Sequence, residues 1–272
     1  LVCYYNQIPV GHVEAGLRTH KRFDPFPEEL NRQLVGVLAD YHFAPTDLAK
    51  FNLLREGIPE TRIFVTGNTV VDSLLYIIDR IRRNEIVVRD DIKNIVDRHK
   101  ESPMILITAH RRESFGEDIR NICLAIQDLA RLFPQCTFIY PVHLNPNIQK
   151  PVYRYLDGIE NVYLIPPLDY LSFLFLMNRS YLILTDSGGI QEEAPSLGKP
   201  LLVLRKETER PEGVEKGVAK LVGVQRGTIV SEAQKLIENK AEYSKMVAAG
   251  NPYGDGHAAD QIVDIILREV LP

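Results

Sequence analysis

The stretch TDSGGIQEE, residues 185–193, continues the apolar run YLILT at residues 181–185 and opens a helical pattern. Two glycines between a strand and a helix let backbone N–H groups approach an anion at the helix N-terminus. The carboxylates one turn later are placed to accept hydrogen bonds from ribose hydroxyls. Taken alone, the stretch also fits a plain strand-to-helix turn with exposed glutamates. It indicates an α/β protein with a candidate phosphate site at Ser187, Gly188 and Gly189.

Apolar runs alternate with helical patterns along the rest of the chain. The longer runs predict strands at residues 104–108, 137–140, 162–165, 181–185, 201–204 and 219–222. Strands that are apolar throughout and joined by crossover helices are typical of a parallel sheet covered on both faces. Shorter runs predict strands at residues 8–13, 41–44 and 62–65. We therefore predict two Rossmann-like domains with the ligand in a cleft between them: residues 1–67 plus 257–272, and residues 68–256.

Composition excludes several classes of protein. The 272 residues are 45% hydrophobic and 25% charged, which is globular rather than disordered. With 32 Lys+Arg and 36 Asp+Glu, the net charge of −4 argues against nucleic-acid or anionic-membrane partners. The longest apolar stretch, around residues 171–177, is too short to span a membrane. Three widely separated cysteines favour a reducing compartment, and we predict the cytoplasm. Because the histidines and cysteines lack ligand spacing, we predict no metal site.

A second candidate site follows the predicted strand at residues 104–108. His110 can hydrogen-bond a phosphate or titrate near neutral pH, and a following arginine can bind an anion with its planar guanidinium. A charged surface loop in which Glu113 neutralises an arginine is an equally good interpretation. Further along, Arg210 stands just before Pro211, which suits a helix start, although a solvated charge run explains the same residues.

Carboxylates gather in the first predicted domain. Glu14 follows a strand, and Glu28 begins a helix on which Arg32 lies four residues later on the same face. Paired carboxylates at a cleft can perform acid and base chemistry when their environments separate their pKa values. Carboxylates such as Glu28 and Glu29 in a first helical turn are also ordinary complements to the helix dipole. Glu14 at a strand end has no such simple explanation.

Seven segments, in this order and spacing, resemble the non-hydrolysing UDP-N-acetylglucosamine 2-epimerases. They are GHVEAGLRT (11–19), PFPEELNR (25–32), FVTGNTVVD (64–72), ITAHRRESFG (107–116), YPVHLNP (140–146), TDSGGIQEEAPSLGKP (185–200) and ERPEG (209–213). The resemblance covers nearly the whole chain. It implies a GT-B-like fold of two Rossmann-like domains and a homodimer.

The resemblance also implies an isomerase that interconverts UDP-GlcNAc and UDP-ManNAc for cell-surface polysaccharide precursors. In the family, UDP is eliminated to give 2-acetamidoglucal and is then added back, which needs no cofactor. The resemblance implies that Glu14, Glu28 and His110 are catalytic: the two carboxylates handle the sugar proton, and His110 helps hold or protonate the UDP. It implies that UDP and the sugar are held by Arg32, Ser187, Gly188, Gly189, Glu193 and Arg210. A second, activating UDP-GlcNAc is implied beside Arg111, Glu113 and His143.

The front of the chain departs from the family pattern. Family members carry an arginine-containing phosphate loop and a catalytic aspartate before the segment that matches Gly11. We therefore expect a fragment of a longer protein, with an incomplete first domain. A chain that truly began at Leu1 is expected to hold UDP and to turn over poorly. Two alternatives stay open at this stage: a catalytically silent UDP-sugar-binding fragment and a GT-B glycosyltransferase.

Overall fold

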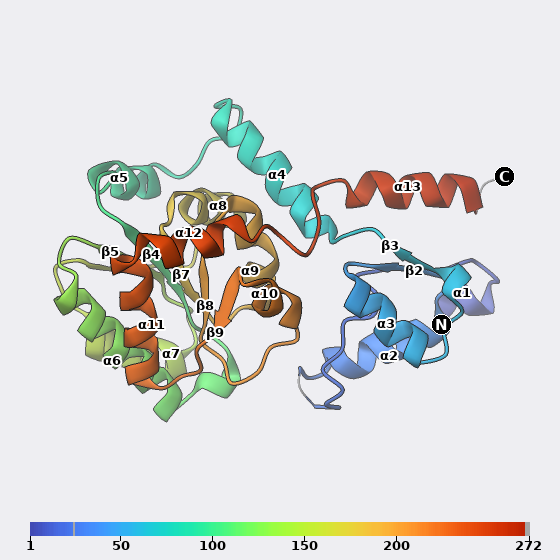
Figure 1. Cartoon of the computed structure of the whole chain (residues 1–272), viewed down its shortest axis with the longest axis horizontal. Helices are drawn as coiled ribbons and strands as arrows, with labels where there is room; N and C mark the ends of the chain where they lie inside the picture. The colour runs from blue at the N-terminus through green and yellow to red at the C-terminus, as the bar shows by residue number, and fades with distance from the viewer. Residues whose placement is uncertain (24, 270–272) are drawn as a thin grey trace. The chain divides into compact units, whose positions relative to one another are not determined.

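A computed structural model of the chain describes residues 1–23 and 25–269. The chain forms two compact units (Figure 1). Unit 1 comprises residues 1–75, 209–212 and 251–272, and unit 2 comprises residues 76–208 and 213–250. Each unit is an α/β layer structure built on its own parallel sheet. The predicted division at residues 67 and 68 stays a prediction, and residues 270–272 of the predicted first domain lie outside the described residues.

Unit 1 is built on a three-stranded parallel sheet with the order β1-β2-β3. The strands are β1 (Gly11–Val13), β2 (Tyr41–Ala44) and β3 (Ile63–Val65). The helices are α1 (Val2–Tyr5), α2 (Glu28–Leu38), α3 (Asp47–Arg55), the 3-10 turn η1 (Glu60–Arg62) and α13 (Ala258–Glu269), and α4 (Thr69–Arg82) begins here. A small core forms where β2 and β3 meet α3, around Ala44, Leu53 and Ile63.

The last helix belongs to unit 1 although it is remote from it in sequence. The Asp72 carboxylate accepts hydrogen bonds from the backbone N–H groups of Ala258 and Ala259, at 3.2 and 2.7 Å, and so caps the start of α13. The Asn68 N–H donates to the carbonyl of Tyr253 at 2.7 Å. These contacts attach the returning chain to the segment that follows β3.

Unit 2 contains six parallel strands in the order β6-β5-β4-β7-β8-β9. They are β4 (Met104–Thr108), β5 (Thr137–Pro141), β6 (Val162–Ile165), β7 (Leu182–Thr185), β8 (Leu201–Val203) and β9 (Ala219–Leu221). Counted from β4, this is the order 3-2-1-4-5-6 of a doubly wound Rossmann sheet. The strand order therefore reverses between β4 and β7, and open α/β sheets bind ligands at the carboxyl ends of such strands.

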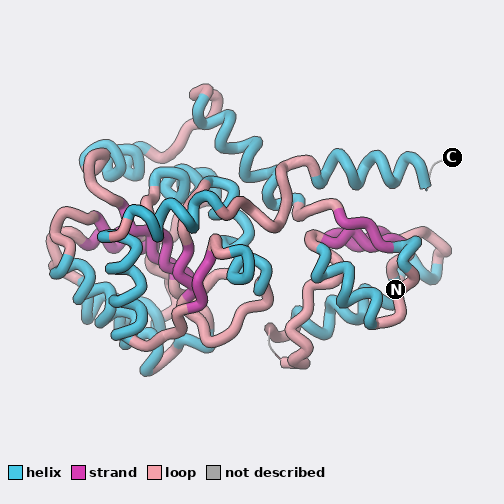
Figure 2. The backbone as a smooth tube through the Cα atoms, in the orientation of Figure 1, coloured by secondary structure: helices cyan, strands magenta, loops and turns pink. Residues whose placement is uncertain are grey.

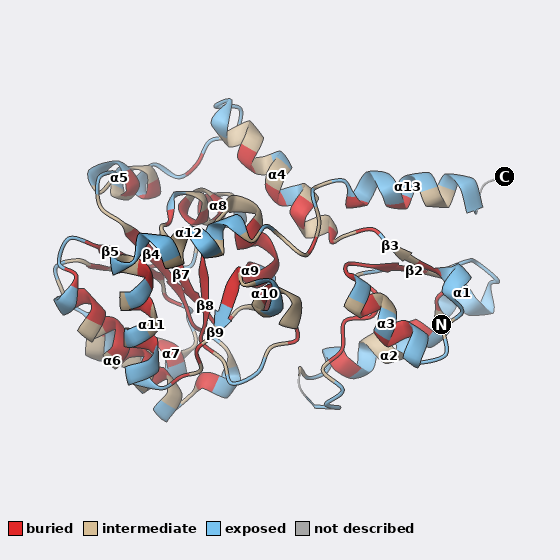
Figure 3. Ribbon diagram, viewed as in Figure 1, coloured by how far each residue is buried: buried red, intermediate tan, exposed pale blue. Residues whose placement is uncertain are grey.

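Helices cover the sheet of unit 2 as the crossover connections require. They are α5 (Asp90–Arg98), α6 (Glu117–Leu132), α7 (Pro146–Leu156), α8 (Tyr170–Arg179), α9 (Gly188–Glu193), α10 (Pro211–Lys216), α11 (Arg226–Glu238) and α12 (Lys240–Ala248), with 3-10 turns η2 (Arg112–Ser114) and η3 (Ala194–Leu197). The tube in Figure 2 shows helices around the strands of this unit. Most residues of the strands, and many residues of α6 and α11, are buried (Figure 3).

The sequence-based predictions of the strands are confirmed with small differences in length. The runs at 41–44, 104–108 and 162–165 match β2, β4 and β6 at both ends. The run at 8–13 is the main exception, because only Gly11–Val13 pairs with β2. Upstream, the Val10 N–H donates to the Asp40 carboxylate instead of to a neighbouring strand. Within the described residues, no helix is long and apolar enough to cross a membrane.

Candidate functional site

The carboxyl ends of β4 and β7 bring two of the predicted motifs together in unit 2. The segment that carries His110 follows β4, and the segment that carries Ser187 follows β7. The two strands are direct neighbours, with Thr108 opposite Thr185, and the hydroxyls of these threonines lie 2.6 Å apart. The topological switch point of the sheet therefore holds both predicted anion-binding segments.

Asp186 ties these segments to each other. Its side chain is fully buried, and Oδ2 accepts hydrogen bonds from the backbone N–H groups of His110 and Arg111, each at 2.8 Å. The other oxygen, Oδ1, lies 3.6 Å from His110 Nδ1. A buried carboxylate needs such partners because its desolvation is costly. Asp186 therefore fixes the backbone at residues 110 and 111 and leaves its second oxygen near the His110 ring.

His110 contacts one of the residues that are predicted to hold a second UDP-GlcNAc. Its ring stacks on that of His143 with the centroids 5.7 Å apart, and the His143 Nδ1 accepts a hydrogen bond from the Asn145 N–H. Arg111 and Glu113 lie 3.6 Å apart as a loose ion pair. The three predicted second-site residues thus lie on the two loops that follow β4 and β5, on either side of His110.

Ser187, Gly188 and Gly189 form the turn from β7 into α9, as predicted. The Ser187 N–H donates to the Thr185 hydroxyl, which shapes the turn. Gly188 is buried, whereas a Cβ added at Gly189 would meet no atom within 4 Å. The protein itself thus leaves open the space beside Gly189, where the backbone of α9 begins.

Glu193 lies at the end of α9 and is almost completely buried. The Tyr170 hydroxyl donates a 2.5 Å hydrogen bond to its Oε1. Burial raises the pKa of Glu193, while the tyrosine bond opposes that shift. Tyr170, the first residue of α8, has a pKa raised by burial and by this carboxylate. The carboxylate predicted to bind ribose hydroxyls is thus held in place by a phenol.

In unit 1, Glu14 and Arg210 meet although 196 positions separate them. Arg210 Nη2 lies 3.7 Å from Glu14 Oε1, and Arg210 Nη1 also contacts Glu209 at 2.5 Å. Arg210 is buried, whereas the Glu14 side chain is 41% exposed. Glu14 also has φ = +66°, a left-handed conformation that costs a non-glycine residue about 1 kcal/mol or more. The structure therefore places an accessible carboxylate beside a buried guanidinium, on a residue whose backbone is strained.

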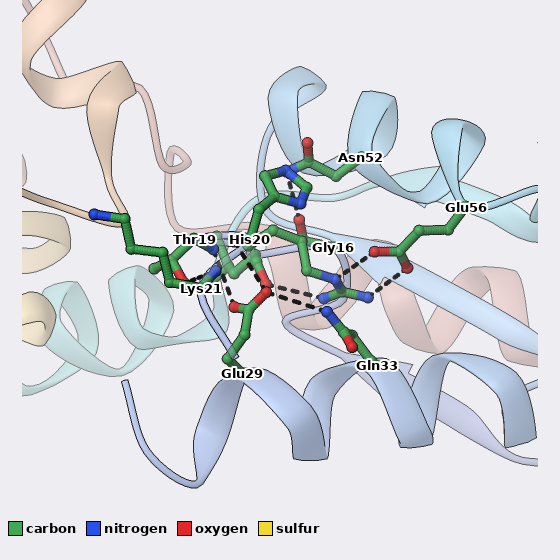
Figure 4. Close-up of polar contacts among 10 residues, drawn as sticks. Gly16, Thr19, His20, Lys21, Glu29, Gln33, Asn52 and Glu56 are labelled. Atoms are coloured by element: carbon green, nitrogen blue, oxygen red, sulfur yellow. Dashed lines mark hydrogen bonds and ion pairs between the residues drawn. The ribbon is translucent and has the colours of Figure 1, made fainter. Parts of the chain in front are cut away.

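The neighbouring carboxylates of α2 differ sharply in environment. Glu28 is exposed, whereas Glu29 is fully buried and accepts hydrogen bonds from the backbone N–H groups of Thr19 and His20, at 3.0 and 3.1 Å (Figure 4). Glu29 therefore anchors the loop that follows Glu14. Arg32, one turn beyond Glu28, has a buried Nη1 with no hydrogen-bond partner in the described part of the chain.

Arg18 supports the same loop from its other side. Its guanidinium pairs with the Glu56 carboxylate through two 2.7 Å hydrogen bonds, and the Asn52 amide donates to the carbonyl of Gly16 at 2.9 Å (Figure 4). Both partners come from α3 or directly follow it. Together with Glu29, these contacts fix residues 16–20 between α2 and α3 and so position the strand end that carries Glu14.

Sequence reasoning did not single out Asp186, Glu29 or Tyr170. Each of the three acts through a polar partner on another segment, and in Asp186 and Glu29 the carboxylate is also buried, which no local pattern reports. For Asp186 a signal was present, since an acidic residue directly after an apolar strand stands at the ligand-binding edge of a parallel sheet. Among residues 1–23 and 25–269, no three His, Cys, Asp or Glu side chains are grouped to hold a metal ion.

Comparisons with known proteins agree along the chain. The family model described as UDP-N-acetylglucosamine 2-epimerase matches residues 1–267. The UDP-N-acetylglucosamine 2-epimerase of Yersinia pestis is 53% identical over 263 residues, which is 97% of this chain and 70% of that protein.

Solved structures of similar proteins share the fold. A UDP-GlcNAc 2-epimerase from Neisseria meningitidis, solved bound to UDP-GlcNAc, superimposes with a TM-score of 0.89 at 48% identity, covering 98% of this chain and 72% of that one. S. aureus MnaA, in a co-structure with UDP, gives 0.90 at 46% identity, covering 97% and 70%. The predicted GT-B-like fold with two Rossmann-like units is confirmed.

Proposed function

The chain belongs to the UDP-N-acetylglucosamine 2-epimerase family and is an isomerase, and from this premise we propose that it interconverts UDP-GlcNAc and UDP-ManNAc. The proposed route is elimination of UDP followed by its addition. A carboxylate removes the proton from C2, the C1–O bond breaks with its electron pair passing to UDP, and a C1–C2 double bond forms. UDP then attacks C1 while a proton is delivered to the opposite face of C2. No net oxidation occurs.

Glu14 and Glu28 are the proposed proton-transfer groups. A base that acts on C2 must be accessible to substrate, and the side chain of Glu14 and the residue Glu28 are both exposed. Epimerisation needs proton chemistry on two faces of one carbon, so two carboxylates suit the reaction better than one. Glu29 is no substitute, because its oxygens are occupied by backbone N–H groups.

His110 and the turn after β7 are proposed to hold the departing UDP. Backbone N–H groups at Ser187, Gly188 and Gly189 would bind phosphate oxygens, and the imidazole would donate a hydrogen bond to the diphosphate as negative charge develops on it. Asp186 supports this role by holding the backbone of His110. Glu193 is proposed to accept hydrogen bonds from the ribose, with Tyr170 fixing its orientation.

The observation that carries the proposal most directly is the pair formed by Glu14 and Arg210. A guanidinium supplies fixed positive charge for a diphosphate or a developing oxyanion. Arg32, with an unpartnered Nη1, is proposed to add positive charge on the sugar side.

Incubation of the protein with UDP-GlcNAc in deuterated water tests the reaction. Proton NMR is expected to show UDP-ManNAc and loss of the C2 proton signal as deuterium enters from solvent. A UDP-sugar-binding protein would give neither signal, and a glycosyltransferase would act only after an acceptor is added. Either result would refute the proposal.

Two variants separate the proposed roles. Glu14→Gln keeps the size of the side chain and removes the base, so exchange at C2 is expected to fall by about 10²-fold or more while UDP binding persists. Asp79→Asn is the control. It removes one exposed carboxylate of α4 from its ion pair with Arg83, and it is expected to leave the rate unchanged. Unchanged exchange in the Glu14 variant would exclude it as a base.

Further expectations follow from family membership alone. We propose a cytoplasmic homodimer that supplies precursors for cell-surface polysaccharide. We also propose that Arg111, Glu113 and His143 contact a second, activating UDP-GlcNAc, which is supported by the stacking of His143 on His110. Sigmoidal dependence of the rate on UDP-GlcNAc, lost in His143→Ala, would be the expected sign of that site.

A further inference from the structure

A basic hollow lies at the amino ends of the strands of unit 2, the sheet edge opposite the one that carries Asp186. It has a volume of about 280 Å³. Met104 begins β4 at its floor, and Lys199 stands two residues before β8. The site proposed for UDP uses only the carboxyl ends of the strands, so that function leaves this hollow unexplained.

The lining of the hollow is cationic. Lys199, Arg179 and Lys100 line it together with His99, and the neutral donors Ser102 and Asn178 complete the polar wall. Of the described residues, none that lines it is a carboxylate. The structure records no ion pair for the three cations within its described part.

Lys199 is the residue that most needs a partner. Burial lowers its pKa, and the positive charge of Arg179 lowers it further. Holding two cations together in a partly buried place costs free energy unless an anion compensates them. His99 adds a second polar group without a partner, because its Nε2 is buried and has no hydrogen-bond partner in the described residues.

Helix ends explain part of this charge. Arg179 is the last residue of α8, and Lys100 comes two residues after α5, so both complement the negative ends of helix dipoles. Lys199 also follows the end of a helical turn, η3, but of the three cations it is the one that is partly buried. The clustering of Lys199 with Arg179 is therefore the feature that points to a ligand.

We propose that this hollow binds the phosphate group of a small phosphorylated molecule. Three cations and two neutral donors around one space suit an oxyanion with several acceptor oxygens better than a single carboxylate. A neighbouring hollow of about 300 Å³ shares His99 and Ser102 and is lined by Tyr163, Asn161 and Thr137. That partly aromatic space, which the carboxylate of Glu160 also lines, would take the rest of the molecule. The two volumes together fall in the range of small-molecule sites.

Proton NMR of the His99 ring, assigned with His99→Gln, tests the proposal at this location rather than at the UDP site. Titration with inorganic phosphate is expected to shift the His99 signal in a saturable way. In Lys199→Met the affinity for phosphate is expected to fall about tenfold or more, as for the loss of one charge-assisted hydrogen bond. Lys150→Met, which removes one exposed lysine from α7, is the matched control and should leave the titration unchanged.

Urea unfolding of the same variants gives an independent readout. Because Lys199 is an uncompensated charge without ligand, Lys199→Met is expected to be at least as stable as the parent chain in phosphate-free buffer. Added phosphate should then stabilise the parent more than the variant. The proposal is overturned if phosphate leaves the His99 signal unmoved, or if Lys199→Met and the parent chain bind phosphate equally.

Discussion

At the residue scale, Asp186 shows how one buried carboxylate joins two functional segments. It accepts hydrogen bonds from N–H groups 76 and 75 positions earlier in the chain. Asp186→Ala would leave two donors without an acceptor, and we expect the free energy of unfolding to fall by about 2–4 kcal/mol. Asp186→Asn keeps one carbonyl oxygen as an acceptor and should lose less. Urea unfolding followed by circular dichroism measures both.

Asp169→Ala is the control for that experiment. Asp169 also accepts a backbone N–H bond, from Ser172, but it does so as the N-cap of α8. Loss of such a cap is expected to cost about 1 kcal/mol. An equal loss in the two alanine variants would contradict the tethering role of Asp186.

Two histidines of unit 1 predict a pH dependence of its stability. His12 and His42 lie opposite each other on β1 and β2. Burial, followed by the charges of His42 and two arginines, lowers the pKa of His12 to about 4, and burial also lowers that of His42. Unfolded histidine has a pKa near 6.5, so below that pH the unfolded state binds protons that the folded state excludes. Stability is therefore expected to fall as the pH drops from about 6.5 toward 4.

Urea midpoints measured between pH 7.5 and 4.5 check this prediction. His12→Gln should show a shallower decline than the parent chain. His257→Gln is the control, because the His257 side chain is 68% exposed and lies on neither strand of this pair. If the parent and His12→Gln decline in parallel, the histidine pair is not the source of the pH dependence.

At the element scale, the predicted strands agree with the structure because strands buried on both faces contain uninterrupted apolar residues. The turn from β7 into α9 was predicted for a similar reason, since glycines mark it locally. The distinction between Glu28 and Glu29 was not predictable, because both letters suit a first helical turn. Only the path of residues 19 and 20, fixed by long-range contacts, decides which carboxylate is buried.

Gly16 carries a prediction about how the loop after β1 packs on α3. Its φ is +86°, and a Cβ there would overlap the carbonyl oxygen of Ala49 and stand 2.7 Å from the carbonyl carbon. Gly57 has nearly the same φ, +83°, but open space around it. Gly57→Ala should therefore cost only the backbone term of about 1–2 kcal/mol. Gly16→Ala is expected to cost about 3 kcal/mol or more, because α3 would also have to move.

Thermal unfolding of the two glycine variants decides between these costs. Equal losses would mean that only the left-handed backbone matters and that the contact with α3 contributes nothing. A larger loss in Gly16→Ala would show that the loop carrying Glu14 depends on close packing against the helix.

At the scale of the whole molecule, the two units differ in how much apolar surface they bury. In the described residues, the large cluster of unit 2 joins β4, β5 and β7 to α6, α7 and α11, whereas the cluster around β2, β3 and α3 of unit 1 is smaller. Unit 1 also carries exposed apolar side chains, among them Val37 at 83% and Val2 at 75% exposure. Because burial of apolar surface is the main stabilising contribution, the two units should differ in stability.

We expect unfolding in two steps, with unit 1 unfolding at the lower urea concentration. The chain contains no tryptophan, so hydrogen exchange read out by peptide mass is the suitable probe. Peptides from β2 should lose protection before peptides from β7. The proposed function places UDP at Ser187 and His110, so UDP should raise the urea concentration at which β7 loses protection. At a hundredfold excess over its dissociation constant, bound UDP adds about 2.7 kcal/mol to the free energy of unfolding. Gly16→Ala should lower only the β2 transition. Coincident loss of protection in both strands, with and without UDP, would instead mean that the two sheets unfold as one cooperative structure and that their separate cores do not set their stabilities.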